Sequence, residues 1–317
     1  MTTRTPAALF SGRQFHNQPQ AGHTHRYLVA LWEDVRAATD GKVSIVVHAQ
    51  NAGVPGSDPQ ALDMLVAGEL EFTAMMGGLL CNVCPPTQVQ SLPFVFSSHQ
   101  QIHRVFDGAL GDHLRAELAT KGIHLLPRAC MENGFRQISS STRPIRSAGD
   151  LEGFTIRVPA GPIFRDIFLA LGAKPIPVNI NELYAALASG RCDGQENPLV
   201  ISEVNKLYEV QRFFSITNHQ WSGFNIVANL AFWRRLPVDV QTLIETIAAR
   251  HVAQQRADVN AFNERLRGVL EARGMQFNDA ETASFRVRLS GLYRTWREVV
   301  GVRTWQLLEA EIGTLSL

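Results

Sequence analysis

Hydrophobic and polar residues follow two periodic patterns, typical of strands and of helices, in the first half of the chain. Apolar positions alternate over residues 42–49, as in a β-strand with one buried face, and residues 7–15 are interpreted as a second strand. Residues 23–41 and 58–68 carry apolar residues three and four positions apart, the spacing of an amphipathic helix. A strand at 70–78 completes a strand–helix–strand–helix–strand order, which predicts a parallel sheet covered by helices.

The second half of the chain repeats this alternation and then becomes helical. We expect a helix at 98–122, strands at 123–131, 134–141, 153–159 and 173–178, helices at 163–172 and 181–190, a short strand or turn at 192–197, a helix from 198, a strand region at 213–233 and helices at 282–313. Residues 239–274 form one continuous helical pattern. At 1.5 Å per residue this helix would reach roughly 50 Å, long enough to span two lobes.

Composition narrows the class of protein. The chain has 317 residues, which favours two domains, and its 30 Lys+Arg against 29 Asp+Glu give a formal charge of +1. No long basic run is present, so we expect no nucleic-acid partner. No stretch approaches the roughly 20 apolar residues of a membrane span. Residues 1–15 lack the apolar core of a secretory signal, so we expect a cytoplasmic protein or an exported one without its signal.

Cys81 and Cys84 form a CxxC spacing that leaves several interpretations open. Such a pair can be half of a metal site, a redox pair or a small disulfide, or it can be two ordinary loop cysteines. A zinc site needs a second pair of ligands, and no such pair is evident in the sequence. The sequence therefore does not decide whether these residues form a disulfide, and it predicts neither a metal site nor a cofactor.

Acid and base residues for an enzyme are present, but their chemical context is missing. Asp193, Glu196 and His219 could act as acid and base around a nucleophile. The chain contains no GxSxG, HExxH or GxxxxGK[ST] motif that would supply the nucleophile, the metal or the phosphate cradle. We therefore expect a protein without catalytic residues, and keep an α/β enzyme acting on an acidic substrate as the alternative.

Arg157 is the first candidate for binding a ligand. It lies in the strand "GFTIRVP", opposite the apolar face, two residues before the proline that ends the strand. Ligands of open α/β sheets bind at the carboxyl ends of strands, and a guanidinium binds a carboxylate or phosphate in a bidentate manner. The alternative is a structural ion pair with Asp150 or Glu152.

Two further residues could assist Arg157. Arg136, in the strand "GFRQIS", could add a second positive charge. Asn197 precedes Pro198 at the start of a helix, where its side chain would cap the helix and could also orient a carboxylate.

The strand "GFTIRVPAG" and the motif "GRCDGQENP" together resemble the solute-binding proteins of tripartite ATP-independent periplasmic (TRAP) transporters, DctP type. The resemblance extends from about residue 8 to about residue 275, with weaker matches in "LVAGELEF" and "VQSLPFVF". It implies an α/β, two-lobed periplasmic-binding-protein-like fold with a long helix bridging both lobes. We expect residues 1–133 and 223–262 in lobe I, residues 134–222 and 263–317 in lobe II, and the ligand cleft between them.

The resemblance also assigns roles to the candidate residues. It implies that Arg157 is the principal carboxylate-binding residue, that Arg136 matches a second arginine near the ligand, and that Asn197 matches the asparagine of the family motif. The partners would be a small organic acid and the membrane subunits of a TRAP transporter, and we expect a periplasmic monomer. A module that senses the ligand without transporting it is a further alternative.

One departure from the family concerns the nature of the ligand. Sialic-acid binders tend to carry an acidic residue after the strand that here reads "LEFTAMMGG". Without it, we expect a partly apolar pocket lined in part by Phe15, Met76, Trp221 and Phe224. Phe15 and Trp221 lie in loop-like stretches. This pattern favours acids with a hydrocarbon portion over fully hydroxylated ones.

Overall fold

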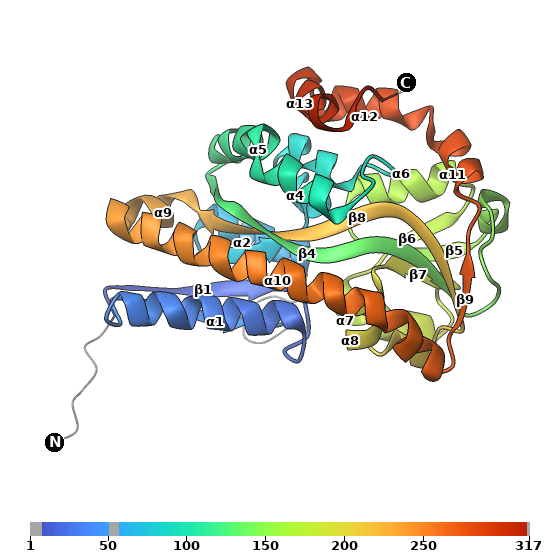
Figure 1. Ribbon diagram of the computed structural model, residues 1–317, viewed down its shortest axis with the longest axis horizontal. Helices are drawn as coiled ribbons and strands as arrows, with labels where there is room; N and C mark the ends of the chain where they lie inside the picture. The colour runs from blue at the N-terminus through green and yellow to red at the C-terminus, as the bar shows by residue number, and fades with distance from the viewer. Residues whose placement is uncertain (1–7, 51–56, 316–317) are drawn as a thin grey trace.

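The structure is a computed structural model that describes residues 8–50 and 57–315. The strands are β1 (Phe10–His16), β2 (Val43–His48), β3 (Phe72–Met75), β4 (Ile123–Ser140), β5 (Thr155–Val158), β6 (Lys174–Pro177), β7 (Gly194–Asn197), β8 (Phe213–Asn229) and β9 (Gln276–Asp279). Within the described ranges they form one sheet in the order β2-β1-β3-β8-β4-β7-β5-β6, with β9 beside β8 (Figure 1).

Helices cover this sheet and join its strands. The α-helices are α1 (His23–Ala38), α2 (Asp58–Ala67), α3 (Gly77–Leu80), α4 (His99–Asp107), α5 (Ala109–Ala119), α6 (Pro162–Ala170), α7 (Ile180–Ala188), α8 (Leu199–Val204), α9 (Leu230–Arg235), α10 (Val238–Ala272), α11 (Thr282–Leu289), α12 (Leu292–Val300) and α13 (Val302–Ile312). Short 3₁₀ turns lie at Pro85–Ser91 (η1), Ala148–Leu151 (η2) and Leu207–Glu209 (η3). None of the helices within the described ranges is long and apolar enough to cross a membrane.

Two long antiparallel strands connect the two lobes. β4 has 18 residues and β8 has 17, and they pair along their lengths with three register shifts. On one side of this pair lie the parallel strands β1, β2 and β3, and on the other lie β5, β6 and β7. The two-lobed α/β architecture predicted from the sequence is therefore confirmed.

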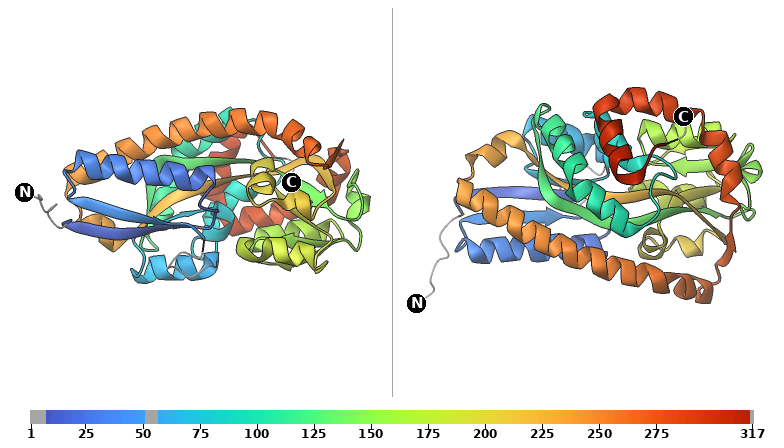
Figure 2. Two further views of the ribbon diagram at one scale, coloured as in Figure 1. Left: turned by 90° about the horizontal axis from the view of Figure 1, so that it is seen from below. Right: turned by 45° about the horizontal axis from the view of Figure 1, so that its top comes forward.

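The long helix α10 runs past both lobes, as the sequence pattern predicted. It has 35 residues and packs on α1 and β4 at one end and on α8 and β9 at the other. Figure 2 shows it extending along the molecule in both views. Its side chains also reach the centre of the sheet, where the Gln255 amide bonds both the backbone N–H and the backbone C=O of Glu132.

The expected strands at 123–131 and 134–141 are one continuous strand in the structure. Gly134 lies at a register shift of β4, pairs with Ser222 of β8, and has a φ of 129°, a conformation that L side chains rarely adopt. The glycine thus bends the strand without ending it. The expected boundaries between the lobes after residues 133 and 222 lie at this irregular point.

The carboxyl-terminal helices pack differently from the expected division into lobes. α11 contacts η2 and α6 of the second lobe, but α12 contacts η1, and α13 contacts α4, α5 and η1. These last elements lie within residues 1–133, which the sequence assigns to lobe I. The division that we propose therefore differs from the expected one by placing α12 and α13 with the first lobe.

Glycine at position 223 is required by close packing at the crossing. A Cβ atom there would meet the Trp221 ring and would lie 2.5 Å from the Met131 carbonyl oxygen. We predict that Gly223→Ala lowers the free energy of unfolding by about 1–3 kcal/mol, because the backbone contact cannot be relieved by a rotamer change. Chemical denaturation measures this effect.

Gly268→Ala is the matched control. Gly268 lies in α10, and a Cβ atom there meets nothing within 4 Å, so alanine should raise the stability by roughly 0.5–1 kcal/mol through its helix propensity. Equal effects of the two substitutions would contradict the packing described for the crossing.

Candidate ligand-binding site

Arg157 lies at the carboxyl end of β5, and its side chain is almost completely buried at 3% exposure. Its Nε–H donates to the carbonyl oxygen of Val178 at 2.8 Å. This is its only hydrogen bond to another described residue, so its two terminal NH₂ groups have no protein acceptor there. The alternative ion pairs do not form, because Asp150 caps the turn at Ser147 and Glu152 pairs with Arg288.

A narrow cavity between the lobes is lined by Arg157. The residues that line it are Asn17, Gln18, Asp58, Met76, Asn133, Arg157, Pro159, Ile180, Asn197 and Phe224. Most of them lie at or just beyond the carboxyl ends of strands β1, β3, β5 and β7. The position of the site thus follows from the direction of the parallel strands in both lobes.

Four of the residues predicted from the sequence meet in this cavity. Arg157, Asn197, Met76 and Phe224 all line it. Asn197 does not cap a helix as expected, because the N-cap residue of α8 is Pro198. Its amide nitrogen donates to Gln195 Oε1 at 2.6 Å instead, which fixes the side chain at the cavity wall.

Arg136 lies behind the cavity and is fully buried. Its Nε and Nη2 donate to the carboxylate of Glu196, and Nη2 also donates to the Glu196 carbonyl oxygen at 2.7 Å. Its guanidinium lies over the Phe164 ring, 5.4 Å from the centroid. Burial disfavours the Glu196 carboxylate, but Arg136 and His219 hold its pKa below the ordinary value. The charge of Arg136 is therefore balanced within the protein.

Phe15 and Trp221 do not line the cavity, and the expectation that they lie in loops is wrong. Phe15 belongs to β1 and is 0% exposed, and Trp221 belongs to β8 and is 1% exposed. Trp221 stacks on Phe106 and donates its indole N–H to Glu132 Oε1 at 2.7 Å. Both side chains thus contribute to the core. The apolar wall consists of Met76, Pro159, Ile180 and Phe224.

A polar wall that the sequence analysis missed faces the same cavity. Asn17 and Gln18 directly follow β1, and Asp58 is the first residue of α2. Asn17 Nδ2 lies 2.9 Å from both carboxylate oxygens of Asp58, and Gln18 Nε2 donates to Asn17 Oδ1 at 2.7 Å. Burial raises the pKa of Asp58 to about 6, although Asn17 and the charge of Arg157 act in the opposite direction. The rule that identified Arg157, that ligands bind at the carboxyl ends of strands, also applies to Asn17 and Gln18.

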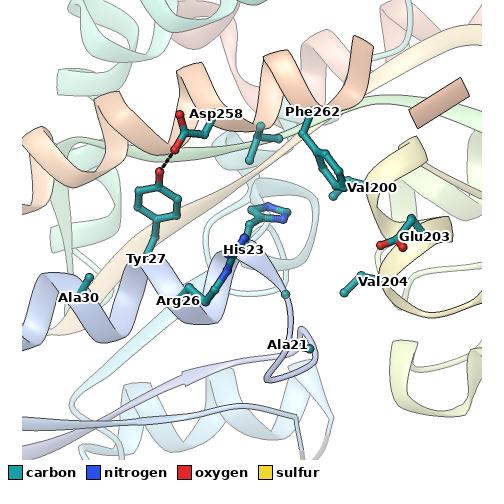
Figure 3. Close-up of a pocket in the computed structure, with 12 residues that line it drawn as sticks. Ala21, His23, Arg26, Tyr27, Ala30, Val200, Glu203, Val204, Asp258 and Phe262 are labelled. Atoms are coloured by element: carbon teal, nitrogen blue, oxygen red, sulfur yellow. Dashed lines mark hydrogen bonds between the residues drawn. The ribbon is translucent and has the colours of Figure 1, made fainter. Parts of the chain in front are cut away.

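A second, wider hollow lies between α1, α8 and α10, with a volume of about 420 Å³. Figure 3 shows the Tyr27 hydroxyl donating to Asp258. It also shows the Phe262 and Val200 side chains, which both line the hollow, next to each other. Its wall is mostly apolar, and none of the residues predicted from the sequence belongs to it.

The cysteines are buried free thiols in the structure. Burial raises the pKa of Cys81 to about 12 and that of Cys84 to about 11, so neither is a ready thiolate. Among the described residues no group of three or more His, Cys, Asp or Glu side chains is placed to hold a metal ion.

Comparisons with known proteins agree with this architecture. The family described as bacterial extracellular solute-binding protein, family 7 (DctP) matches residues 15–298. A solute-binding protein of Verminephrobacter eiseniae is 31% identical over 277 residues, which cover 87% of this chain and 81% of that protein.

Solved structures show the same fold. A TRAP periplasmic solute-binding protein of Roseobacter denitrificans with bound β-D-glucuronate is 27% identical, with a TM-score of 0.90 over 96% of this chain and 100% of that one. A Bradyrhizobium protein in complex with galacturonate is 26% identical, with a TM-score of 0.89 over the same shares. The chain therefore belongs to the DctP family of extracellular solute-binding proteins, the substrate receptors of TRAP transporters.

Proposed function

We propose that the protein captures a small organic acid in the cavity between its lobes, with Arg157 as the group that binds the carboxylate. The receptor then delivers the acid to the membrane subunits of a TRAP transporter, and we place it in the periplasm as a monomer. The alternative of an enzyme is set aside, because the family and the structural neighbours are transporter receptors. A receptor that only senses the acid would bind it in the same way, and neighbouring permease genes would distinguish transport from sensing.

The incomplete hydrogen bonding of Arg157 carries this proposal. Burial lowers its pKa to about 10, even though Glu196 and Asp58 favour its charged form. A buried guanidinium is stabilised by a paired anion, and its planar fork accommodates a carboxylate in a bidentate manner. Glucuronate and galacturonate, the ligands of two structural neighbours, each carry one carboxylate, which supports an acid as the ligand.

The distribution of the lining residues supports closure of the lobes on the ligand. Asn17, Asp58 and Met76 come from the first lobe, whereas Arg157 and Asn197 come from the second. A ligand that contacts both sets binds the closed form better than the open one, and shifts the population by that difference in affinity. Exclusion of water on closure would also strengthen the pair between Arg157 and the carboxylate.

We predict that Arg157→Ala lowers the affinity for the acid at least about 100-fold, because a buried carboxylate would lose its paired charge. Arg157→Lys should lose less affinity than Arg157→Ala but should still bind the acid much more weakly than the native protein. An ammonium group cannot form the two parallel hydrogen bonds of a guanidinium. Titration calorimetry measures both, with whichever of galacturonate, glucuronate, erythronate and succinate binds the native protein best.

Arg165→Ala is the control for this experiment. Arg165 lies on α6 with an exposed side chain and pairs with Asp166, so its loss should leave the affinity unchanged. A folded Arg157→Ala variant that binds the acid as tightly as the native protein would refute the proposed function.

The buried carboxylate of Asp58 should destabilise the empty receptor at neutral pH. Its pKa rises from 3.8 to about 6 on folding, so the folded state holds the proton more tightly. Asp58 therefore stabilises the fold below pH 4, and this contribution is lost as the pH rises to 6. We predict that Asp58→Asn is more stable than the native protein at pH 7.5, with an advantage about 2–3 kcal/mol larger than at pH 4.

Asp63→Asn provides the matched comparison on the same helix. Asp63 is exposed, so its replacement should change the free energy of unfolding by a similar small amount at both pH values. Chemical denaturation of the native protein and both variants at pH 4 and pH 7.5 gives the change in the free energy of unfolding for each variant at each pH. An Asp58→Asn advantage that does not grow with pH would show that Asp58 is not a desolvated carboxylate.

A further inference from the structure

Two buried amide oxygens at the cavity have no hydrogen-bond partner among the residues that the structure describes. They are Gln18 Oε1 and Asn133 Oδ1, on side chains that are 4% and 1% exposed. Both residues line the cavity that Arg157 also lines. A buried acceptor without a partner costs about 1–3 kcal/mol, so such groups in a binding cavity indicate a donor that the ligand supplies.

The orientation of these amides is set by their own donors. Asn133 Nδ2 donates to Ser222 Oγ at 3.0 Å, and Gln18 Nε2 donates to Asn17 Oδ1 at 2.7 Å. Asn17 is fixed in turn, because only its nitrogen can donate to the Asp58 carboxylate. With every amide nitrogen engaged, the oxygens of Gln18 and Asn133 are the atoms left for a ligand.

Asp58 supplies a third acceptor on the same wall. An ionised carboxylate can accept about four hydrogen bonds, and in the described part of the chain its oxygens receive them from Asn17 Nδ2 alone. The positive charge of Arg157 lowers the pKa of Asp58. The cavity therefore has one positive group and a wall of acceptors that includes a negative charge.

From this inventory we propose that the ligand is a monocarboxylic acid with several hydroxyl groups, such as an aldonate or a uronate. Arg157 binds the carboxylate, as in the proposed function on which this inference rests, while Gln18, Asp58 and Asn133 accept hydrogen bonds from the hydroxyls. A dicarboxylate is rejected, because its second carboxylate has no proton to donate and would face the charge of Asp58. This assignment replaces the apolar selectivity expected from the sequence.

The proposal predicts a specific order of affinities among acids of equal length. A site built to bind hydroxyl groups discriminates strongly against analogues that lack them, since its acceptors then remain unpaired. We expect erythronate to bind at least about tenfold tighter than butyrate and succinate, which have the same number of carbons. Galacturonate should likewise bind more tightly than hexanoate and adipate, which have the same number of carbons.

The selectivity should depend on Asp58. Asp58→Asn removes the negative charge and keeps the shape, so it should narrow the preference for erythronate over succinate, and for galacturonate over adipate, by about tenfold or more. Asp63→Asn, on the exposed side of the same helix, should leave both ratios unchanged. Calorimetric titration of the whole chain and of the three variants Asp58→Asn, Asp63→Asn and Arg157→Ala with the six acids gives all of these ratios.

The outcomes separate this inference from the proposed function. If succinate or butyrate binds as tightly as erythronate, and adipate or hexanoate as tightly as galacturonate, while Arg157→Ala abolishes binding, the inference is overturned and the function stands. If the hydroxy acids bind equally well to Arg157→Ala, the proposed function fails, because the carboxylate is held elsewhere. If none of the six acids binds, both fail. Unchanged ratios in Asp58→Asn would also overturn the role given to Asp58.

Discussion

A buried guanidinium whose terminal NH₂ groups have no acceptor among the described residues is the constraint on which the rest of the site depends. The Nε–H of Arg157 donates to the Val178 carbonyl oxygen, and burial lowers the pKa of the guanidinium. Charge at this depth has to be balanced by its surroundings. Glu196 helps to balance it, but the carboxylate of Glu196 is itself bound by Arg136. The guanidinium thus has electrostatic support, but its two terminal NH₂ groups have no acceptor within residues 8–50 and 57–315, and an incoming carboxylate can supply one.

The fold places Arg157 in a cavity that residues of both lobes line. β4 and β8 pass through both lobes, and the parallel strands on each side end toward one cavity. At the crossing, Glu132 accepts hydrogen bonds from Trp221 of β8 and from His99 and His103 of α4, while Gln255 of α10 bonds its backbone. Asn133, the next residue, lines the cavity. The crossing between the lobes and the ligand site therefore share neighbouring positions of one strand.

Much of this arrangement could be predicted from the sequence, and the failures have identifiable causes. The alternation of strands and helices, the length of α10 and the place of Arg157 before Pro159 are local patterns. By contrast, the Arg136–Glu196 pair joins residues 60 positions apart, which no local pattern indicates. Phe15 and Trp221 were misplaced because they were assigned to loop-like stretches, although the expected strands at 7–15 and 213–233 include them and β1 and β8 continue through them. Asp58 was missed because its burial depends on Asn17 of another element.

The central claim is that Arg157 holds the carboxylate of the bound acid inside the cavity between the lobes. A crystal structure of the protein with galacturonate, or with whichever of the tested acids binds, examines this claim most directly. The account predicts a bidentate contact between the ligand carboxylate and the two terminal NH₂ groups of Arg157. A carboxylate bound in the hollow between α1, α8 and α10, or one that faces away from Arg157, would contradict it.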